Sequence, residues 1–253
     1  MRKVDVHCHS DLYTDPELAA IFQDDALMVV SAATGFNSGN RLLHLSKVYT
    51  NLKVCLGIHP EYPSAIPEFE KVADQIRKNL SNIVGIGEVG LPWYCLDKIP
   101  APERERFQEK ALECFKKFVK LASSCDLPLV LHAIEDTTAQ ALDVLEKQGI
   151  RRALFHWFEG RITDLERILS NGYFISVSPD AIHNVRYGDF TDHIPLDALM
   201  LESDGPWEYN GKRGIPSMIE DTAAFLADRR KLDPITILQA NYRNYLHLFK
   251  QHL

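Results

Sequence analysis

The sequence contains no apolar run of about 18 residues, the minimum for a membrane-spanning helix. It also lacks an N-terminal hydrophobic signal core, because Asp5, His7 and His9 interrupt the first apolar stretch. Cysteine is scarce: there are five, without a C-x-x-C pair, which favours free thiols in a reducing compartment. We therefore expect a cytoplasmic protein with no membrane partner, and nothing indicates an obligate protein partner.

Positive charge is also in short supply. Lys and Arg number 28 against 35 Asp and Glu, which gives a formal net charge of −7. This balance argues against a broad nucleic-acid-binding surface. It still permits a small phosphate-binding pocket, because bound metal ions supply positive charge locally.

Low-complexity linkers, blocks of like charge and internal repeats are missing from the 253 residues, of which 45% are hydrophobic. A chain of this length and composition suits one globular domain, and α/β barrels of this size are commonly single domains. We predict a single domain spanning residues 1–253.

Short apolar segments rich in β-forming residues alternate with helical segments along the chain. Strands are predicted at residues 4–9, 27–32, 54–59, 83–90, 128–132, 153–158, 173–177 and 199–204. The clearest helical pattern covers residues 103–123, and the C-terminal third predicts helices at 217–229, 233–240 and 242–249. The alternation predicts an α/β fold, a parallel (β/α)8 TIM-type barrel. A doubly wound open sheet is the alternative, but no Gly-rich phosphate loop follows the first strand.

Histidines and acids stand near the carboxyl ends of several predicted strands. His7 and His9 alternate along the first strand and therefore point to one face. Similar positions on later strands hold Glu88, His132, His156 and Asp204. Each alone has a structural explanation, such as a hydrogen-bonded core histidine or a turn aspartate. Together they point to one cavity, because a closed barrel brings these strand ends together on the face where barrel enzymes carry their chemistry.

This set of side chains suits metal binding. It exceeds what one tetrahedral ion needs while leaving a position for water. Two divalent ions about 3.5–4 Å apart would use the set better, with one carboxylate bridging them, and would activate water for hydrolysis. The ligand types do not decide whether the metal is Mg, Mn or Zn.

Six motifs, in order, resemble those of the TatD-related metal-dependent deoxyribonucleases, members of the amidohydrolase-like (β/α)8 barrels. The resemblance runs from residue 4 to about residue 216, and residues 241–249 resemble the family's C-terminal helix. The motifs are His7-Cys8-His9, Gly57-Ile58-His59-Pro60, Gly87-Glu88-Val89-Gly90-Leu91, Leu131-His132, His156-Trp157-Phe158-Glu159-Gly160 and Ser203-Asp204-Gly205-Pro206.

The resemblance implies a role for each of these residues. One metal would be held by His7, His9 and Asp204, the other by His132 and His156, and Glu88 would bridge them. Asp204 and Glu88 are implied as catalytic, with Asp204 as the base that orients the attacking water. His59 is implied as a substrate-binding or supporting residue of the pocket.

The resemblance also implies a substrate, DNA with single-stranded or frayed ends, with Arg161, Lys212 and Arg213 as candidate phosphate contacts. The chain departs from the usual motifs at Pro92, Ile134 and Gly214-Ile215, where the family commonly has polar residues. These departures and the acidic charge favour an alternative, hydrolysis of a small amide, lactone or phosphate ester at the same metals. A non-catalytic metal-binding protein would fit only without the water-activating acid, and Asp204 is present.

Overall fold

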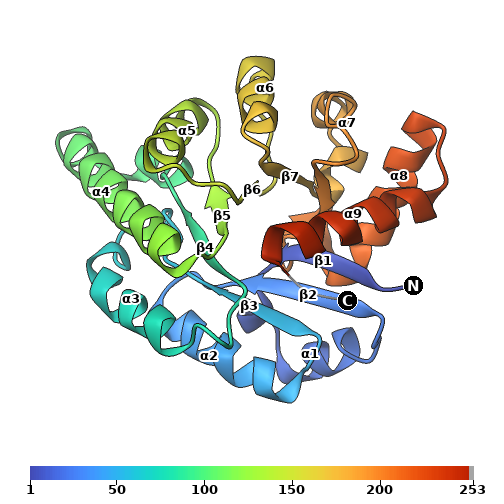
Figure 1. Cartoon of the computed structure of the whole chain (residues 1–253), viewed down its shortest axis with the longest axis horizontal. Coiled ribbons are helices and arrows are strands. Elements are labelled where there is room, and N and C mark those ends of the chain that lie inside the picture. The colour runs from blue at the N-terminus through green and yellow to red at the C-terminus, as the bar shows by residue number, and fades with distance from the viewer. Residues whose placement is uncertain (251–253) are drawn as a thin grey trace.

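Eight parallel strands form one sheet that curves into a barrel, and helices lie around its outside (Figure 1). The computed structural model describes residues 1–250. The strands pair in chain order and comprise β1 (Lys3–Cys8), β2 (Leu27–Ala32), β3 (Leu52–Leu56), β4 (Gly85–Gly90), β5 (Leu129–His132), β6 (Ala153–Phe155), β7 (Phe174–Val177) and β8 (Leu199–Leu201). The predicted TIM-type barrel is confirmed.

The helices largely follow the predicted pattern. They are α1 (Asp15–Ile21), α2 (Phe36–Val48), α3 (Phe69–Lys78), α4 (Ala101–Cys125), α5 (Asp136–Gln148), α6 (Ile162–Ser170), α7 (Val185–Thr191), α8 (Ile219–Arg230) and α9 (Pro234–Phe249). The prediction of separate helices at 233–240 and 242–249 is wrong, because α9 continues through Asn241. No described helix is both long and apolar enough to cross a membrane.

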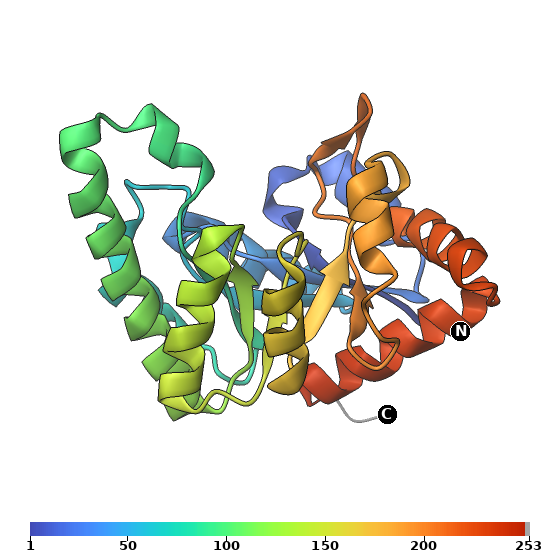
Figure 2. The same cartoon turned by 90° about the horizontal axis from the view of Figure 1, so that it is seen from above.

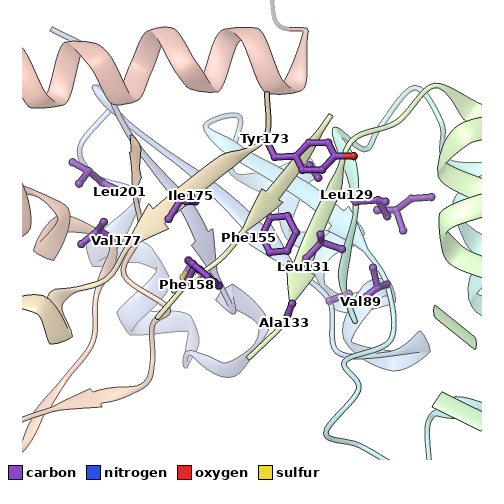
Figure 3. Packing of buried hydrophobic residues seen from close by; sticks show 14 of the residues in the cluster. Val89, Leu129, Leu131, Ala133, Phe155, Phe158, Tyr173, Ile175, Val177 and Leu201 are labelled. Carbon is purple, nitrogen blue, oxygen red and sulfur yellow. The ribbon is translucent and has the colours of Figure 1, made fainter. Parts of the chain in front are cut away.

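Buried side chains form two layers, one inside the barrel and one between the strands and the outer helices. The inner layer includes Val130 and Leu154 and is covered by Tyr245 and Leu248 of α9. The outer layer takes the alternate strand positions, and Figure 3 shows Leu129, Leu131 and Phe155 among its members. This inside–outside alternation is what places every second side chain of a barrel strand in the interior.

The seam between β8 and β1 closes the barrel through individually placed hydrogen bonds. Asn241 of α9 bridges the seam: its amide nitrogen donates to the Val4 carbonyl at 2.7 Å, and its oxygen accepts from the Leu201 N–H at 3.0 Å. Beyond β8, the Asp204 N–H donates to the His7 carbonyl at 3.0 Å. The first and last strands of the barrel are thereby held together next to the site described below.

A short antiparallel hairpin, β9 (Glu208–Tyr209) and β10 (Lys212–Arg213), follows β8. Figure 2 shows this hairpin standing at one end of the barrel, while α9 runs across the other end. The 3-10 helix η3 (Tyr94–Lys98), which leads into α4, rises at the same end as the hairpin (Figure 2). Two loops therefore flank the carboxyl ends of the strands.

Candidate metal centre

The histidines expected at the strand ends converge on the carboxylate of Glu88. Glu88 lies on β4 and is fully buried. Its Oε2 is 3.3 Å from Nε2 of His7 and 3.3 Å from Nε2 of His9. Its Oε1 is 2.9 Å from Nδ1 of His132 and 2.9 Å from Nε2 of His156. One carboxylate thus faces a different pair of imidazoles with each oxygen.

Strand alternation explains the positions of His132 and His156, and a register shift in β1 accompanies those of His7 and His9. Val130 and Leu154 point into the barrel, so His132 and His156, two residues later, face the same way. On β1 the pairing register with β2 shifts between Asp5 and Cys8. The His7 and His9 rings still lie together, with centroids 5.0 Å apart.

Asp204 joins the centre on the side of His7 and His9. Its Oδ1 lies 3.3 Å from Nε2 of His7 and 3.5 Å from Nε2 of His9. Asp204 has a left-handed backbone with φ of 43°, uncommon for a residue other than glycine. Such conformations concentrate at functional sites. His7, His9 and Asp204 form one group able to hold a metal ion.

His59 lies inside the cluster. Its Nε2 is 3.2 Å from Oε1 of Glu88, and His59, Glu88 and His132 form another group able to hold a metal ion. A third such group combines His7, Glu88 and His156. The position of His59 permits metal ligation as well as contact with a substrate, which the sequence pattern alone did not indicate.

The chemistry of the donor set fits a divalent cation. Several atoms that face the centre are buried without a hydrogen-bond partner: Nε2 of His7, Oε2 of Glu88 and Oδ1 of Asp204. Leaving such atoms unpaired in the interior is costly. Imidazole nitrogens with carboxylate oxygens suit Zn and Mn, and the carboxylates also suit Mg. A cation would satisfy all of these atoms at once.

Electrostatics within the cluster support ionised carboxylates. Burial raises the pKa of Glu88, but the histidines around it, His59 first, hold that pKa well below its ordinary value. Burial lowers the pKa of His9, and the Asp204 and Glu88 carboxylates outweigh it, so that pKa is well above its ordinary value. Because metals bind neutral imidazole, protons compete with them, and metal affinity falls as the pH falls.

Glu61 is a site residue that the sequence analysis did not single out. One of its oxygens lies 3.1 Å from Nε2 of His132. The same carboxylate accepts the backbone N–H groups of Trp93 at 2.6 Å, Tyr94 at 3.0 Å and Cys95 at 2.6 Å. Burial opposes ionisation, but the bonds from His132 and from the N–H groups of Trp93 and Cys95 lower the pKa of Glu61 to about 2. Glu61 therefore ties the start of η3 to the metal centre.

Two further buried acids stand behind the candidate ligands. Glu202 has one oxygen 3.6 Å from Nδ1 of His156, and its other oxygen accepts from the Ser176 hydroxyl at 2.5 Å. Asp5 accepts from the Ser203 hydroxyl at 2.5 Å and from its N–H at 2.9 Å, which links β1 to the end of β8. The sequence feature that could have indicated both residues is an acid within an apolar strand, because a buried acid requires a partner.

The barrel and its histidine–carboxylate centre define a metal-dependent hydrolase. Comparison with known proteins refines that class: the sequence profile of the family described as TatD related DNase matches residues 4–250. The chain belongs to this family, as the order of its motifs predicted.

Relatives from distant organisms cover nearly the whole chain. A Haemophilus influenzae protein named as an uncharacterized metal-dependent hydrolase is 31% identical over 233 residues, 90% of this chain and 91% of its own. Human deoxyribonuclease TATDN3 is 23% identical and covers 97% of this chain and 94% of its own. The crystal structure of YjjV, the TatD homologue from Escherichia coli, superposes with a TM-score of 0.81 at 24% identity, covering 99% of both chains.

Proposed function

We propose that this chain is a deoxyribonuclease that hydrolyses phosphodiester bonds from DNA ends, using two divalent metal ions. The observation that carries the proposal is the arrangement around Glu88. His7 and His9, with Asp204 beside them, face one oxygen, and His132, His156 and His59 face the other. Two groups on opposite oxygens of one carboxylate are what a bridged metal pair requires. The name of the family and of the human relative supports DNA as the substrate.

The chemistry assigned to the chain itself rests on Asp204. Two divalent ions held at the centre would lower the pKa of water and polarise the phosphate. Burial opposes ionisation of Asp204, but His7 and His9 keep its pKa well below the ordinary value, so the side chain is a carboxylate at neutral pH. It is 13% exposed, which leaves it able to meet a water molecule from the open end of the barrel. Asp204 is therefore the proposed proton acceptor.

The cations near the mouth favour a strand end over a duplex. Arg161 is hydrogen-bonded to Asp136, and Arg213 pairs with Glu17 at 3.0 Å. Lys212 is exposed on the hairpin. With a net charge of −7 and two of the three candidate cations engaged, few contacts with phosphate remain. We expect a shallow salt dependence, since each neutralised phosphate adds about 0.7 to the log–log slope on single strands.

Digestion of end-labelled linear and circular single-stranded DNA, with Mg and with Mn, tests the proposal. The linear substrate should be shortened from its end and the circle left intact. Asp204→Asn should lower the rate at least about 100-fold, because an amide cannot accept the proton of water. The variant should retain at least one metal, because the amide oxygen still binds it. Asp197→Asn, at an exposed position before β8, is the matched control and should cut normally.

Two results would contradict the proposal. Equal cutting of circles and linear strands would remove the end preference, and near-normal cutting by Asp204→Asn would remove Asp204 from catalysis.

A second function is hydrolysis of a small amide, lactone or phosphate ester at the same centre. The engagement of Arg161 and Arg213 by carboxylates favours it, because a small substrate needs no phosphate-binding cations outside the centre. Metal-dependent turnover of such a compound, without cutting of DNA, would select this function.

A further inference from the structure

Exposed aromatic side chains gather at the metal centre. Tyr62, Tyr94 and Trp207 are 48%, 62% and 61% exposed, and they are the exposed aromatic residues within 1–250. The Tyr62 ring lies 5.3 Å from that of His59, and the Tyr94 ring lies 6.3 Å from that of His132. Trp207 follows Asp204 by three positions. We call these three side chains the aromatic rim.

Hydrogen bonds hold the backbone of two of these residues in place. The Trp207 N–H donates to the Asp204 carbonyl at 3.0 Å, and its carbonyl accepts from Gly214 at 2.7 Å. The Tyr94 N–H is one of the three held by Glu61. A backbone that is already ordered loses little freedom when a flat ligand stacks on its side chain, which favours binding.

A fourth aromatic side chain, Trp157, contacts Trp207. Trp157 follows His156 directly and has a left-handed backbone with φ of 40°. Its ring lies 6.1 Å from that of Trp207, edge to face, and 5.6 Å from that of Tyr209. The Trp157 indole therefore contacts both Trp207 and Tyr209 of the hairpin.

We propose that the aromatic rim is a stacking subsite for unpaired nucleobases beside the bond that is cleaved. The inference rests on the proposed nuclease function and names how the substrate is recognised. The neighbouring Arg161 and Arg213 are paired with carboxylates, whereas the exposed rings offer flat apolar faces to a ligand. Every base has a π-face, so stacking tolerates any sequence, but it requires bases that are not stacked in a duplex. Tyr94 on η3 and Trp207 before the hairpin lie on the two loops that stand at this end of the barrel (Figure 2).

The test compares a normal single-stranded oligonucleotide with one in which tetrahydrofuran abasic residues flank the cleaved bond. Trp207→Ala and Tyr94→Ala should each raise KM on the normal strand by roughly five- to 100-fold, the range for losing one stacked base, and leave kcat within about twofold. On the abasic strand, where wild type is already weakened, neither variant should cause further loss. Trp207→Phe, which keeps an aromatic ring, should retain most of the stacking and raise KM much less than Trp207→Ala. Ile235→Ala, an exposed apolar position at the start of α9, is the control.

A binding measurement separates the two proposals. Asp204→Asn loaded with Mn, with and without Trp207→Ala, is titrated with fluorescently labelled normal or abasic strand and followed by anisotropy. Base-dependent binding by a protein that does not cut DNA would uphold the rim and overturn the nuclease. If the protein cuts DNA, but the rim variants lose activity equally on normal and abasic strands or lose none, the stacking proposal is overturned and the nuclease proposal is upheld. No binding of either strand would overturn both.

Discussion

The nitrogen of His156 that faces away from the centre, Nδ1, has the Glu202 carboxylate 3.6 Å behind it. That pair is an ion pair beyond hydrogen-bonding distance, whereas two other rings have a hydrogen-bonding partner: Nδ1 of His9 lies 2.9 Å from the Ala32 carbonyl, and Nε2 of His132 lies 3.1 Å from Glu61. A partner on the far nitrogen sets which nitrogen carries the proton and orients the ring. In all three rings the other nitrogen is thereby directed at Glu88 or Asp204.

Glu202→Gln should weaken metal binding by about 10- to 100-fold, the usual effect of removing a carboxylate behind a metal-binding histidine. The amide oxygen still accepts from Ser176, so the fold should be kept. Competition with a chelator of known affinity measures the metal Kd, and Glu208→Gln, exposed on the hairpin, is the control. An unchanged Kd would show that Glu202 does not support His156.

Sequence patterns identified the residues that lie at equivalent positions on several strands. They did not identify the residues whose role depends on a single contact with a distant histidine. His132, His156 and Glu88 were recognisable because each lies near the carboxyl end of an apolar strand, and a barrel brings such ends together. Glu61 carries no comparable pattern, and the place of Glu202 in an apolar strand shows only that it needs a partner, not which one. Their partners, His132 and His156, are 71 and 46 positions away, as the numbering shows. Such pairs become visible only once the strands are placed side by side.

At the scale of elements, the strands were predictable because apolar runs of β-forming residues mark them. The hairpin at Glu208–Arg213 and the seven-residue α7 were not predicted. Both are short, and tertiary contacts rather than periodicity hold them. The division of α9 at Asn241 was wrong because asparagine is a weak helix former in isolation, whereas here its side chain is satisfied by two strands.

Asn241→Ala should destabilise the protein by about 2–6 kcal/mol, since two buried backbone groups lose their partner and each costs about 1–3 kcal/mol. The affected groups are the Val4 carbonyl and the Leu201 N–H at the seam of the barrel. Thermal unfolding should show a fall in Tm of roughly 5 °C or more. Arg243→Ala, exposed on the same helix, should change Tm little. A normal Tm for Asn241→Ala would mean that the seam closes without this bridge.

At the scale of the whole molecule, we expect folding and metal binding to be coupled through protons. In the metal-free protein His9 and His156 have pKa values well above 6.5, because nearby carboxylates outweigh burial. Groups with a raised folded pKa stabilise the fold below their ordinary pKa, and this contribution is lost as the pH rises through the folded value. Glu88 has a lowered pKa, so its contribution is present throughout the range above its ordinary value of 4.5. We therefore expect protons to stabilise the metal-free centre at low pH and metal ions to replace them at higher pH.

The stability gained from metal should therefore grow with pH. Free metal at about 100 times its Kd adds about 2.7 kcal/mol, which corresponds to several degrees in Tm. We expect a clear fall in Tm on chelation near pH 8, recovery on adding metal, and a much smaller effect near pH 5.5, where histidine protons compete with the metal.

Elemental analysis at neutral pH should find two divalent ions per chain, and fewer in His7→Ala plus His9→Ala. That double variant should stay folded, because the substituted side chains lie at the functional end of the barrel. A chelation effect independent of pH, or no bound metal after reconstitution, would exclude the coupling between protons and metal at Glu88.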